Sequence, residues 1–222
     1  MPDGIRSLFH HLPDRRCHIM RIALTALVSA SLLAGCASEV RERVASNYGR
    51  VGAAAIMQGD WDTARRAFAR VTVNADLAEL PAARRALAHY EYGRSLGVTC
   101  YFDRAEEELN TAYKLDKEAG QPLYLSLVEL ARLNLDQNKF SQAAAYFERA
   151  IPLLEADGVT KAAPIGYADI LDEYASALVG VGRPAEAKLS ADRAATLRKA
   201  AEGQRSITDR TPYGKFCGKS RS

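Results

Sequence analysis

The strongest constraint on the fold is a phrase of thirteen residues that occurs four times along the chain. Its copies are GDWDTARRAFARV at 59–71, CYFDRAEEELNTA at 100–112, NKFSQAAAYFERA at 138–150 and GRPAEAKLSADRA at 182–194. Each copy has a turn residue or its substitute at the start, a ring-bearing residue two positions later, and alanine three positions after that. Further apolar or small residues follow at offsets of four and three. These offsets place the positions on one face of an α-helix, so the phrase predicts a repeated amphipathic helix.

Aligning the copies gives four columns of residues that face the same way. The columns are Trp61, Phe102, Phe140, Pro184; then Ala64, Ala105, Ala143, Ala187; then Phe68, Leu109, Phe147, Ala191; then Val71, Ala112, Ala150, Ala194. Upstream of each copy lies another helical stretch with a small residue where two helices must cross, at Gly52, Gly93, Ala131 and Ala175. Small side chains let helices approach closely, and the larger ones fill the space beside them. A plain helical bundle whose alanines coincide by chance is the alternative.

The pattern resembles the tetratricopeptide repeat (TPR), a pair of antiparallel helices that stacks on copies of itself. The resemblance covers residues 36–202 nearly completely and implies an all-α fold, a right-handed α-solenoid of about four helix hairpins stabilised by stacking. Successive phrases are 41, 38 and 44 residues apart, whereas the family period is about 34. The closing proline of the family is missing and the fourth copy is degenerate. Three of the first helices are expected to begin near a proline, at Pro81, Pro122 and Pro164.

The N-terminal segment, residues 1–35, has the pattern of a targeting leader. From Met20 the sequence reads MRIALTALVSASLLAGC, a short basic stretch followed by an apolar stretch too short for a permanent membrane span. The end of this stretch, Leu33-Ala34-Gly35-Cys36, resembles the bacterial lipobox. The resemblance implies cleavage before Cys36 and acylation of this cysteine, because several acyl chains anchor a protein stably where one does not. An ordinary cleaved signal peptide is the alternative, and Met20 is the expected start.

The residues that follow the lipobox favour a periplasmic location. Ala37 and Ser38 lack the aspartate that commonly retains lipoproteins in the inner membrane. We therefore expect the periplasmic face of the outer membrane, with the inner membrane as the alternative. In this oxidising compartment Cys100 and Cys217 are a candidate disulfide that would tie the C-terminus to the second hairpin. Two independent thiols are the other reading.

The charge is distributed unevenly between the repeats and the C-terminal tail. The whole chain has a formal charge of +3, but residues 203–222 contain five basic residues against one acidic residue. The repeats therefore carry a small acidic excess, whereas a nucleic-acid-binding protein usually has a basic stripe on its folded body. We predict no nucleic-acid partner. The tail is either an ordinary terminus or, with Tyr213 and Phe216 beside Cys217, a patch docked on the body.

Residues suited to catalysis or metal binding are sparse beyond the leader. His89 is the one histidine there, and it stands where a core aromatic is expected, so we assign it to packing. The sequence has no CxxC, HExxH or GxxxxGK[ST] motif, and no GxSxG elbow at a turn between a strand and a helix. Acidic residues such as Asp169 and Glu173 are first interpreted as solvated helix faces. We predict no enzyme activity, metal or cofactor; the alternatives are a cell-envelope enzyme with a carboxylate site and a carrier of small ligands or lipids.

The TPR resemblance implies that the first helices of the hairpins line a concave groove for a protein or peptide partner. The candidate groove residues are Tyr90, Arg94, Val128, Arg132, Asp172 and Ser176. Arg94 and Arg132 are equivalent positions, and two stacked guanidiniums suit a carboxylate of an acidic segment or C-terminus. Alternatively, each arginine pairs with the glutamate three residues before it, Glu91 or Glu129.

The leader and the repeats together are similar in plan to TPR lipoproteins of Gram-negative bacteria that assist pilus assembly. This resemblance implies a membrane-anchored, non-enzymatic scaffold that recruits a protein partner for a pilus, a secretin or another envelope complex. One fold can serve many functions, so this expectation rests on the similarity of the fold and of the targeting leader.

Overall fold

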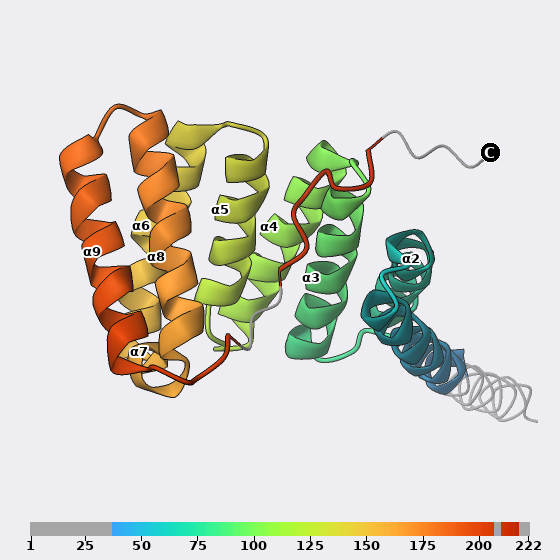
Figure 1. Cartoon of the computed structure of the whole chain (residues 1–222). Helices are drawn as coiled ribbons and strands as arrows, with labels where there is room; N and C mark the ends of the chain where they lie inside the picture. Colours follow the sequence, from blue (N-terminus) through green and yellow to red (C-terminus); the bar gives the residue numbers. More distant parts are fainter. Residues whose placement is uncertain (1–36, 207–209, 218–222) are drawn as a thin grey trace, which may run out of the picture.

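A computed structural model of the chain describes residues 37–206 and 210–217 (Figure 1). The predictions for the leader, for the start at Met20 and for lipidation of Cys36 fall outside these residues. Within them, every regular element is a helix. The first helix is described over residues 37–57. It is followed by α2 (Trp61–Leu77), α3 (Ala82–Val98), α4 (Phe102–Glu118), α5 (Tyr124–Asp136), α6 (Phe140–Ala156), α7 (Val159–Ala162), α8 (Pro164–Gly180) and α9 (Pro184–Ala200).

The aligned phrase marks where the second helix of each hairpin begins. The helices α2, α4, α6 and α9 start at the four residues of the ring-bearing column. Two positions earlier the backbone is left-handed in every hairpin, with positive φ at Gly59 (72°), Cys100 (73°), Asn138 (58°) and Gly182 (74°). This conformation ends the first helix and turns the chain back, and glycine adopts it at the lowest cost. Cys100 therefore stands at a position that favours glycine.

The alanine column forms the tightly packed line between paired helices. Ala64, Ala105 and Ala143 are completely buried, and so are the larger Leu109 and Phe147 beside them. The crossing glycines on the first helices are equally constrained by their neighbours. A Cβ at position 52 would lie 2.6 Å from the ring of Phe68, and one at position 93 would lie 2.8 Å from Leu109 Cγ. Such approaches are too short for a side chain, so these helices cross where the sequence places its smallest residues.

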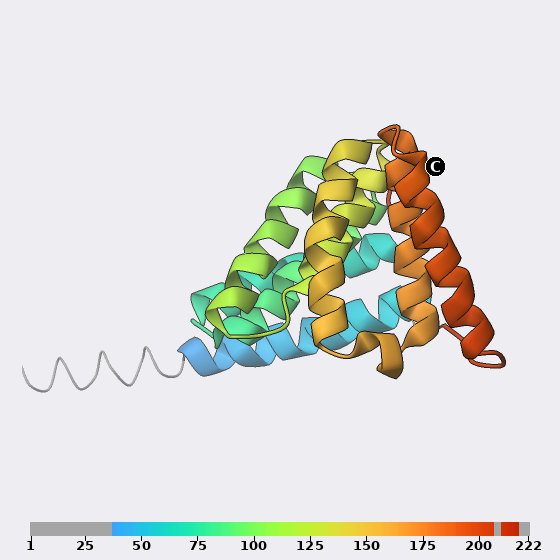
Figure 2. The same ribbon diagram turned by 90° about the vertical axis from the view of Figure 1, so that its left-hand side faces the viewer.

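The hairpins stand in a row, and their orientation changes along it. In Figure 1 the row runs from α9 to α2, with α3, α5 and α8 as neighbouring first helices. In Figure 2 the helix of residues 37–57 runs across the direction of α6 and α9, so the row twists as a superhelix. This arrangement confirms the predicted all-α solenoid of TPR-like hairpins.

One feature of the chain path was not predicted. A short helix, α7, lies between the third and fourth hairpins and begins after Gly158, whose φ is 74°. It accounts for part of the longer spacing between the third and fourth phrases. The three expected prolines do lie near helix starts, since Pro81 caps α3, Pro122 lies two residues before α5 and Pro164 opens α8. Within the described residues no helix combines the length and the apolar character needed to cross a membrane.

Candidate functional site

The C-terminal tail lies in the groove formed by the first helices. After α9 the chain turns back and runs across the face of α8, α5 and α3 (Figure 1). Its amides pair with the end of α3: Gly214 N donates to Gly97 O at 3.0 Å and Phe216 N to Val98 O at 3.3 Å. The structure joins Cys217 to Cys100 in a disulfide with the two Cα atoms 5.4 Å apart. The tail is thus docked on the body, and the bond links it to the turn between α3 and α4.

Tyr213 is the anchor of this docked segment. Its side chain is only 6% exposed and packs against Gly97, where a Cβ would come within 2.3 Å of the tyrosine ring. Its hydroxyl donates to Glu129 Oε2 at 2.6 Å, and its backbone N–H donates to Asp136 Oδ2 at 2.8 Å. Burial and the adjacent Glu129 carboxylate raise the pKa of Tyr213 well above its ordinary value. The phenol therefore stays protonated and keeps its role as a hydrogen-bond donor.

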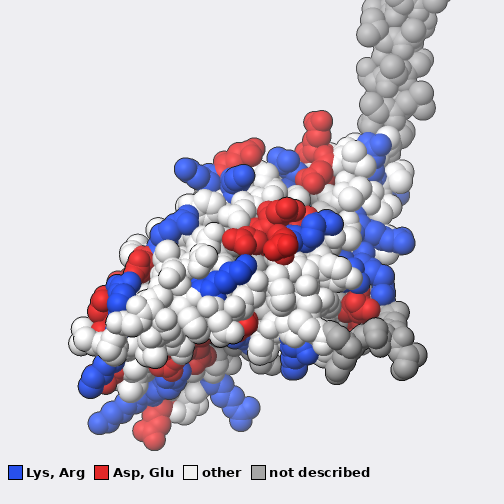
Figure 3. Space-filling model, turned by 90° about the horizontal axis from the view of Figure 1, so that it is seen from above, with Lys and Arg blue, Asp and Glu red and all other residues white. Residues whose placement is uncertain are grey.

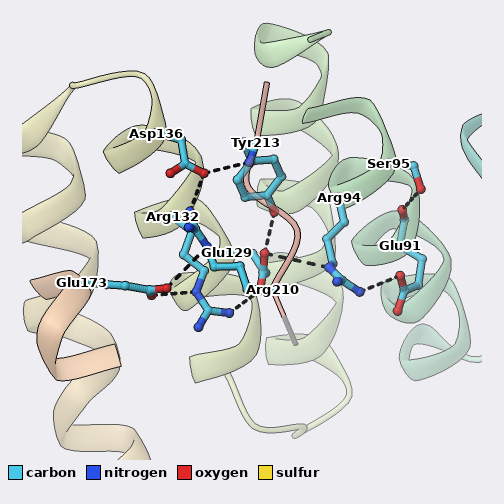
Figure 4. Close-up of polar contacts among 9 residues, drawn as sticks. All are labelled: Glu91, Arg94, Ser95, Glu129, Arg132, Asp136, Glu173, Arg210 and Tyr213. Carbon is cyan, nitrogen blue, oxygen red and sulfur yellow. Dashed lines mark hydrogen bonds and ion pairs between the residues drawn. The ribbon is translucent and has the colours of Figure 1, made fainter. Parts of the chain in front are cut away.

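Beneath the tail, acidic and basic side chains alternate from helix to helix (Figure 4). Arg94 of α3 lies 3.1 Å from Glu91 and 3.9 Å from Glu129. On α5, Arg132 donates from Nη1 to Glu129 at 3.0 Å and from Nε to Glu173 of α8 at 2.8 Å. The alternation links three first helices through charge-assisted hydrogen bonds and close ion pairs, which hold the floor of the groove in one arrangement.

The tail adds its own cation to this row of charges. The guanidinium of Arg210 pairs with Asp136 at the end of α5, and its Nε lies 3.4 Å from Glu173 Oε1. Asp136 therefore accepts hydrogen bonds both from the Arg210 side chain and from the backbone N–H of Tyr213. Two residues of the tail, three positions apart, thus lie against three carboxylates contributed by α5 and α8.

The glutamates of the groove differ in their protonation energetics. Burial alone would raise the pKa of Glu129, but the charges of Arg132 and Arg94 and the hydrogen bond from Tyr213 bring it below its ordinary value. Burial raises the pKa of Glu91 and of Glu173 in spite of their arginine neighbours. Glu129 is consequently the most firmly ionised of the three glutamates. It is also the one that accepts the hydrogen bond from the Tyr213 hydroxyl.

Four of the six groove residues predicted from the sequence lie together. Tyr90, Arg94, Val128 and Arg132 line one hollow with Tyr213 of the tail. Both arginines pair with the glutamate of their own helix, as one reading of the sequence proposed, and each also reaches a glutamate of the next helix. The carboxylates expected from a partner are therefore supplied by the chain itself.

The other two predicted residues, on α8, do not line this hollow. Asp172 lies 2.6 Å from Arg198 of α9, which also reaches Asp169 at 2.7 Å. The hydroxyl of Ser176 donates to the backbone oxygen of Asp172 at 2.9 Å. Asp172 is thus engaged with the last helix instead of the arginine row.

The first hairpin leaves a further part of the groove open. Between the helix of residues 37–57, α2 and α3 lies a hollow of about 480 Å³, largely apolar, with Ile56, Phe68 and Val71 in its lining. Two large side chains at its border, Met57 and Leu87, are 89% and 62% exposed. Arg94 borders both this hollow and the one that the tail helps to line. The two hollows are therefore neighbouring parts of one groove.

Neither one view of the surface nor a search for metal ligands among the described residues points to a second kind of site. On the face seen in Figure 3, basic and acidic side chains are interspersed. Among residues 37–206 and 210–217, no three His, Cys, Asp or Glu side chains are placed to hold a metal ion together.

No protein-family model and no curated protein matches the sequence. The chain is similar in structure to BtubC (BKLC) from P. vanneervenii, with a TM-score of 0.68 and 15% identity over 77% of this chain and 69% of that one. It is also similar to two crystal structures of a Podosopora anserina kinesin light chain with nearly identical TPR-like repeats. Their TM-scores are 0.56 and 0.55 at 15% identity, over 87% and 82% of this chain and 100% and 95% of theirs. The fold is TPR-like.

The TPR-like alignment contains a signal for one residue that sequence reasoning did not place in the groove. Glu173 lies 44 residues after Glu129, the same offset that separates Pro184 from Phe140, and Glu91 lies 38 residues before Glu129. The three glutamates therefore form a column of their own on the first helices. Asp136 and Arg210 carry no such signal, because they meet only when the tail folds back.

Proposed function

We propose that this protein is a non-enzymatic scaffold that binds a segment of a partner protein along the groove of its TPR-like hairpins. One observation carries the proposal: the groove already accommodates a segment of the chain itself, the tail, through backbone and side-chain contacts. Peptide segments bind in this way when a concave surface offers both hydrogen-bond partners and pockets for side chains.

The open hollow beside the first hairpin is a part of the groove available to a partner. Its apolar lining and the exposed Met57 and Leu87 at its border would gain from burial, at about 25 cal/mol for each Å² removed from water. Exposed apolar side chains gathered at a hollow are typical of interaction sites. A partner segment with large apolar side chains suits this part.

The proposal includes a lipid anchor at Cys36 and a position on the periplasmic face of the outer membrane. The lipobox-like Leu33-Ala34-Gly35-Cys36 supports the anchor. The Cys100–Cys217 disulfide is compatible with an oxidising compartment outside the cytoplasm. A scaffold at this address would serve an envelope assembly such as a pilus or a secretin.

Site-specific photocrosslinking tests where a partner binds. A photoreactive amino acid at Leu87, beside the open hollow, should give one defined crosslinked protein in intact cells. The matched control is Leu189 on α9, which is 70% exposed and lies away from the hollow. Equal crosslinking from both positions, or none from Leu87, would contradict binding in the groove.

Metabolic labelling tests the anchor separately. Cells given a labelled fatty acid should produce a labelled protein, and the Cys36→Ser variant should carry no label. A label that persists in that variant, or one that is missing from the wild type, would rule out acylation at this cysteine.

A further inference from the structure

The charges of the groove favour a basic segment over an acidic one. Among the side chains drawn in Figure 4, α3, α5 and α8 contribute four carboxylates (Glu91, Glu129, Asp136 and Glu173) and two guanidiniums (Arg94 and Arg132). Both arginines are already within 4 Å of carboxylates of the body. The net charge of this set is negative, so the electrostatic complement is a cation. The tail supplies it as Arg210.

The tail also shows how specificity beyond charge is achieved. The ring of Tyr213 occupies the space left by the missing side chain of Gly97, and its hydroxyl reaches the most firmly ionised glutamate. A segment without a hydrogen-bond donor at this point would leave the buried carboxylate without a partner. Because an unsatisfied buried acceptor costs free energy, the site discriminates strongly against such a segment. Arg210 and Tyr213 are three residues apart, so they define a short recognisable pattern.

The disulfide keeps this occupant in place. Cys100 adopts a positive φ of 73°, at the turn position where two of the other hairpins have glycine. A dithiol reductant would open the bond in two exchange steps. Its thiolate attacks one sulfur and displaces the other, and its second thiol then closes the reductant's own disulfide, leaving both protein cysteines as thiols. The tail would afterwards be held by its non-covalent contacts alone.

We propose that the groove of α3, α5 and α8 is a binding site for protein segments with a basic residue three positions before a tyrosine. Residues 210–217 are its resident occupant, and reduction of the Cys100–Cys217 bond makes that occupant exchangeable. The inference deepens the proposed function and rests on it, since it names the partner chemistry of the tail-filled part of the groove.

A disulfide-trapping assay tests the recognition directly. The full chain would carry Arg210→Ala, Tyr213→Ala and Cys217→Ser, which disable its own tail and leave Cys100 as a thiol. The probe is a synthetic peptide of residues 210–217, RTPYGKFC, offered in a glutathione buffer. Peptide mapping by mass measures the mixed disulfide formed between the probe and Cys100, apart from any formed at Cys17 or Cys36. The matched control peptide has alanine in place of both Arg210 and Tyr213 and keeps the same cysteine.

The native peptide should reach half-maximal trapping at a concentration at least about tenfold lower than the control peptide, as expected for hydrogen bonds to charged groups. Adding Glu129→Gln to the chain should remove most of that preference. Equal trapping of the two peptides by a folded chain overturns the proposal. It would leave the crosslinking result at Leu87 untouched, so the two failures can be told apart.

Hydrogen exchange of the wild-type chain gives a second test, which does not depend on whether a substituted chain folds. On treatment with dithiothreitol the amides of Gly214 and Phe216 should exchange faster, while those of α3 and α5 stay protected. If α3 and α5 lose their protection together with the tail, the tail is a permanent part of the core and the exchange proposal is overturned.

Discussion

Replacing Gly97 with alanine should dislodge the tail without changing any residue of the tail. A Cβ at this position would lie 2.3 Å and 2.6 Å from two ring carbons of Tyr213 and 3.0 Å from Leu133 Cδ1. Non-bonded carbon atoms do not approach this closely, so either the Tyr213 ring or the Leu133 side chain must move. Leu133 is completely buried, whereas Tyr213 belongs to a segment outside the helices. The tyrosine ring is therefore the group we expect to leave.

The size of the effect follows from opposing terms. Gly→Ala inside a helix stabilises by about 0.5–1 kcal/mol. Overpacking costs about 1–3 kcal/mol if the ring stays. If the ring leaves, the chain loses its burial, about 1.5–3 kcal/mol, and a hydrogen bond to a charged acceptor, about 1.5–3 kcal/mol. A Cβ 2.3 Å from the ring leaves no room for it to stay, so both losses apply and only the helix gain offsets them. The variant should therefore lose about 2–5 kcal/mol of unfolding free energy.

Gly49→Ala is the matched control for this experiment. Gly49 also lies within a helix, but a Cβ there would meet no atom within 4 Å. That variant should gain the propensity term of about 0.5–1 kcal/mol. Urea unfolding of both variants with the disulfide closed measures the difference, and hydrogen exchange at Gly214 and Phe216 reports the tail. If Gly97→Ala is as stable as Gly49→Ala and the tail amides stay protected, Tyr213 does not occupy the position described here.

Two further predictions concern the disulfide and the buried histidine. The Cys100–Cys217 bond spans 117 residues, and the chain-entropy model gives about 5 kcal/mol as the upper value for such a loop. Cys217→Ser should lower the urea midpoint to that of the dithiothreitol-treated wild type, and an unchanged midpoint would contradict the bond. Burial lowers the pKa of His89, but Glu108 at 2.5 Å and Asp76 at 3.2 Å raise it above the ordinary 6.5 overall. Its stabilising contribution is thus complete below that value and is lost as the pH rises through the folded pKa. The wild type should lose unfolding free energy relative to His89→Gln as the pH rises above the ordinary pKa of 6.5, and a constant difference would speak against the ion pairs.

The repeat architecture could be predicted because its signals are local and periodic. The ring-bearing residues, such as Trp61 and Phe102, mark helix starts to the residue, since the turn before them and the buried alanine after them both lie in the same phrase. The position of Gly93 at a helix crossing follows from the same alignment. These features depend on residues close in sequence, so one chain suffices to find them.

The groove was harder to predict because its contacts join distant parts of the chain. Arg210 meets Asp136 across 74 residues, and Tyr213 meets Glu129 across 84. No periodicity links the tail to the hairpins, although the apolar residues beside Cys217 indicated docking. The histidine assignment was incomplete for the same reason: His89 is largely buried as expected, yet it contacts carboxylates from α2 and α4 that only the packing brings together.

The disulfide also decides how the molecule would respond to tension. If the chain is pulled between residue 37 and residue 217, the pulling force passes from Cys100 directly to Cys217 through the sulfur atoms. The helices α4 to α9 lie within the loop that the disulfide closes, so they bear none of the pulling force. The helix of residues 37–57, α2 and α3 bear all of it. Reduction would extend the strain to every hairpin, so the same bond that returns the tail to the middle of the row also sets which half of the row can be pulled apart.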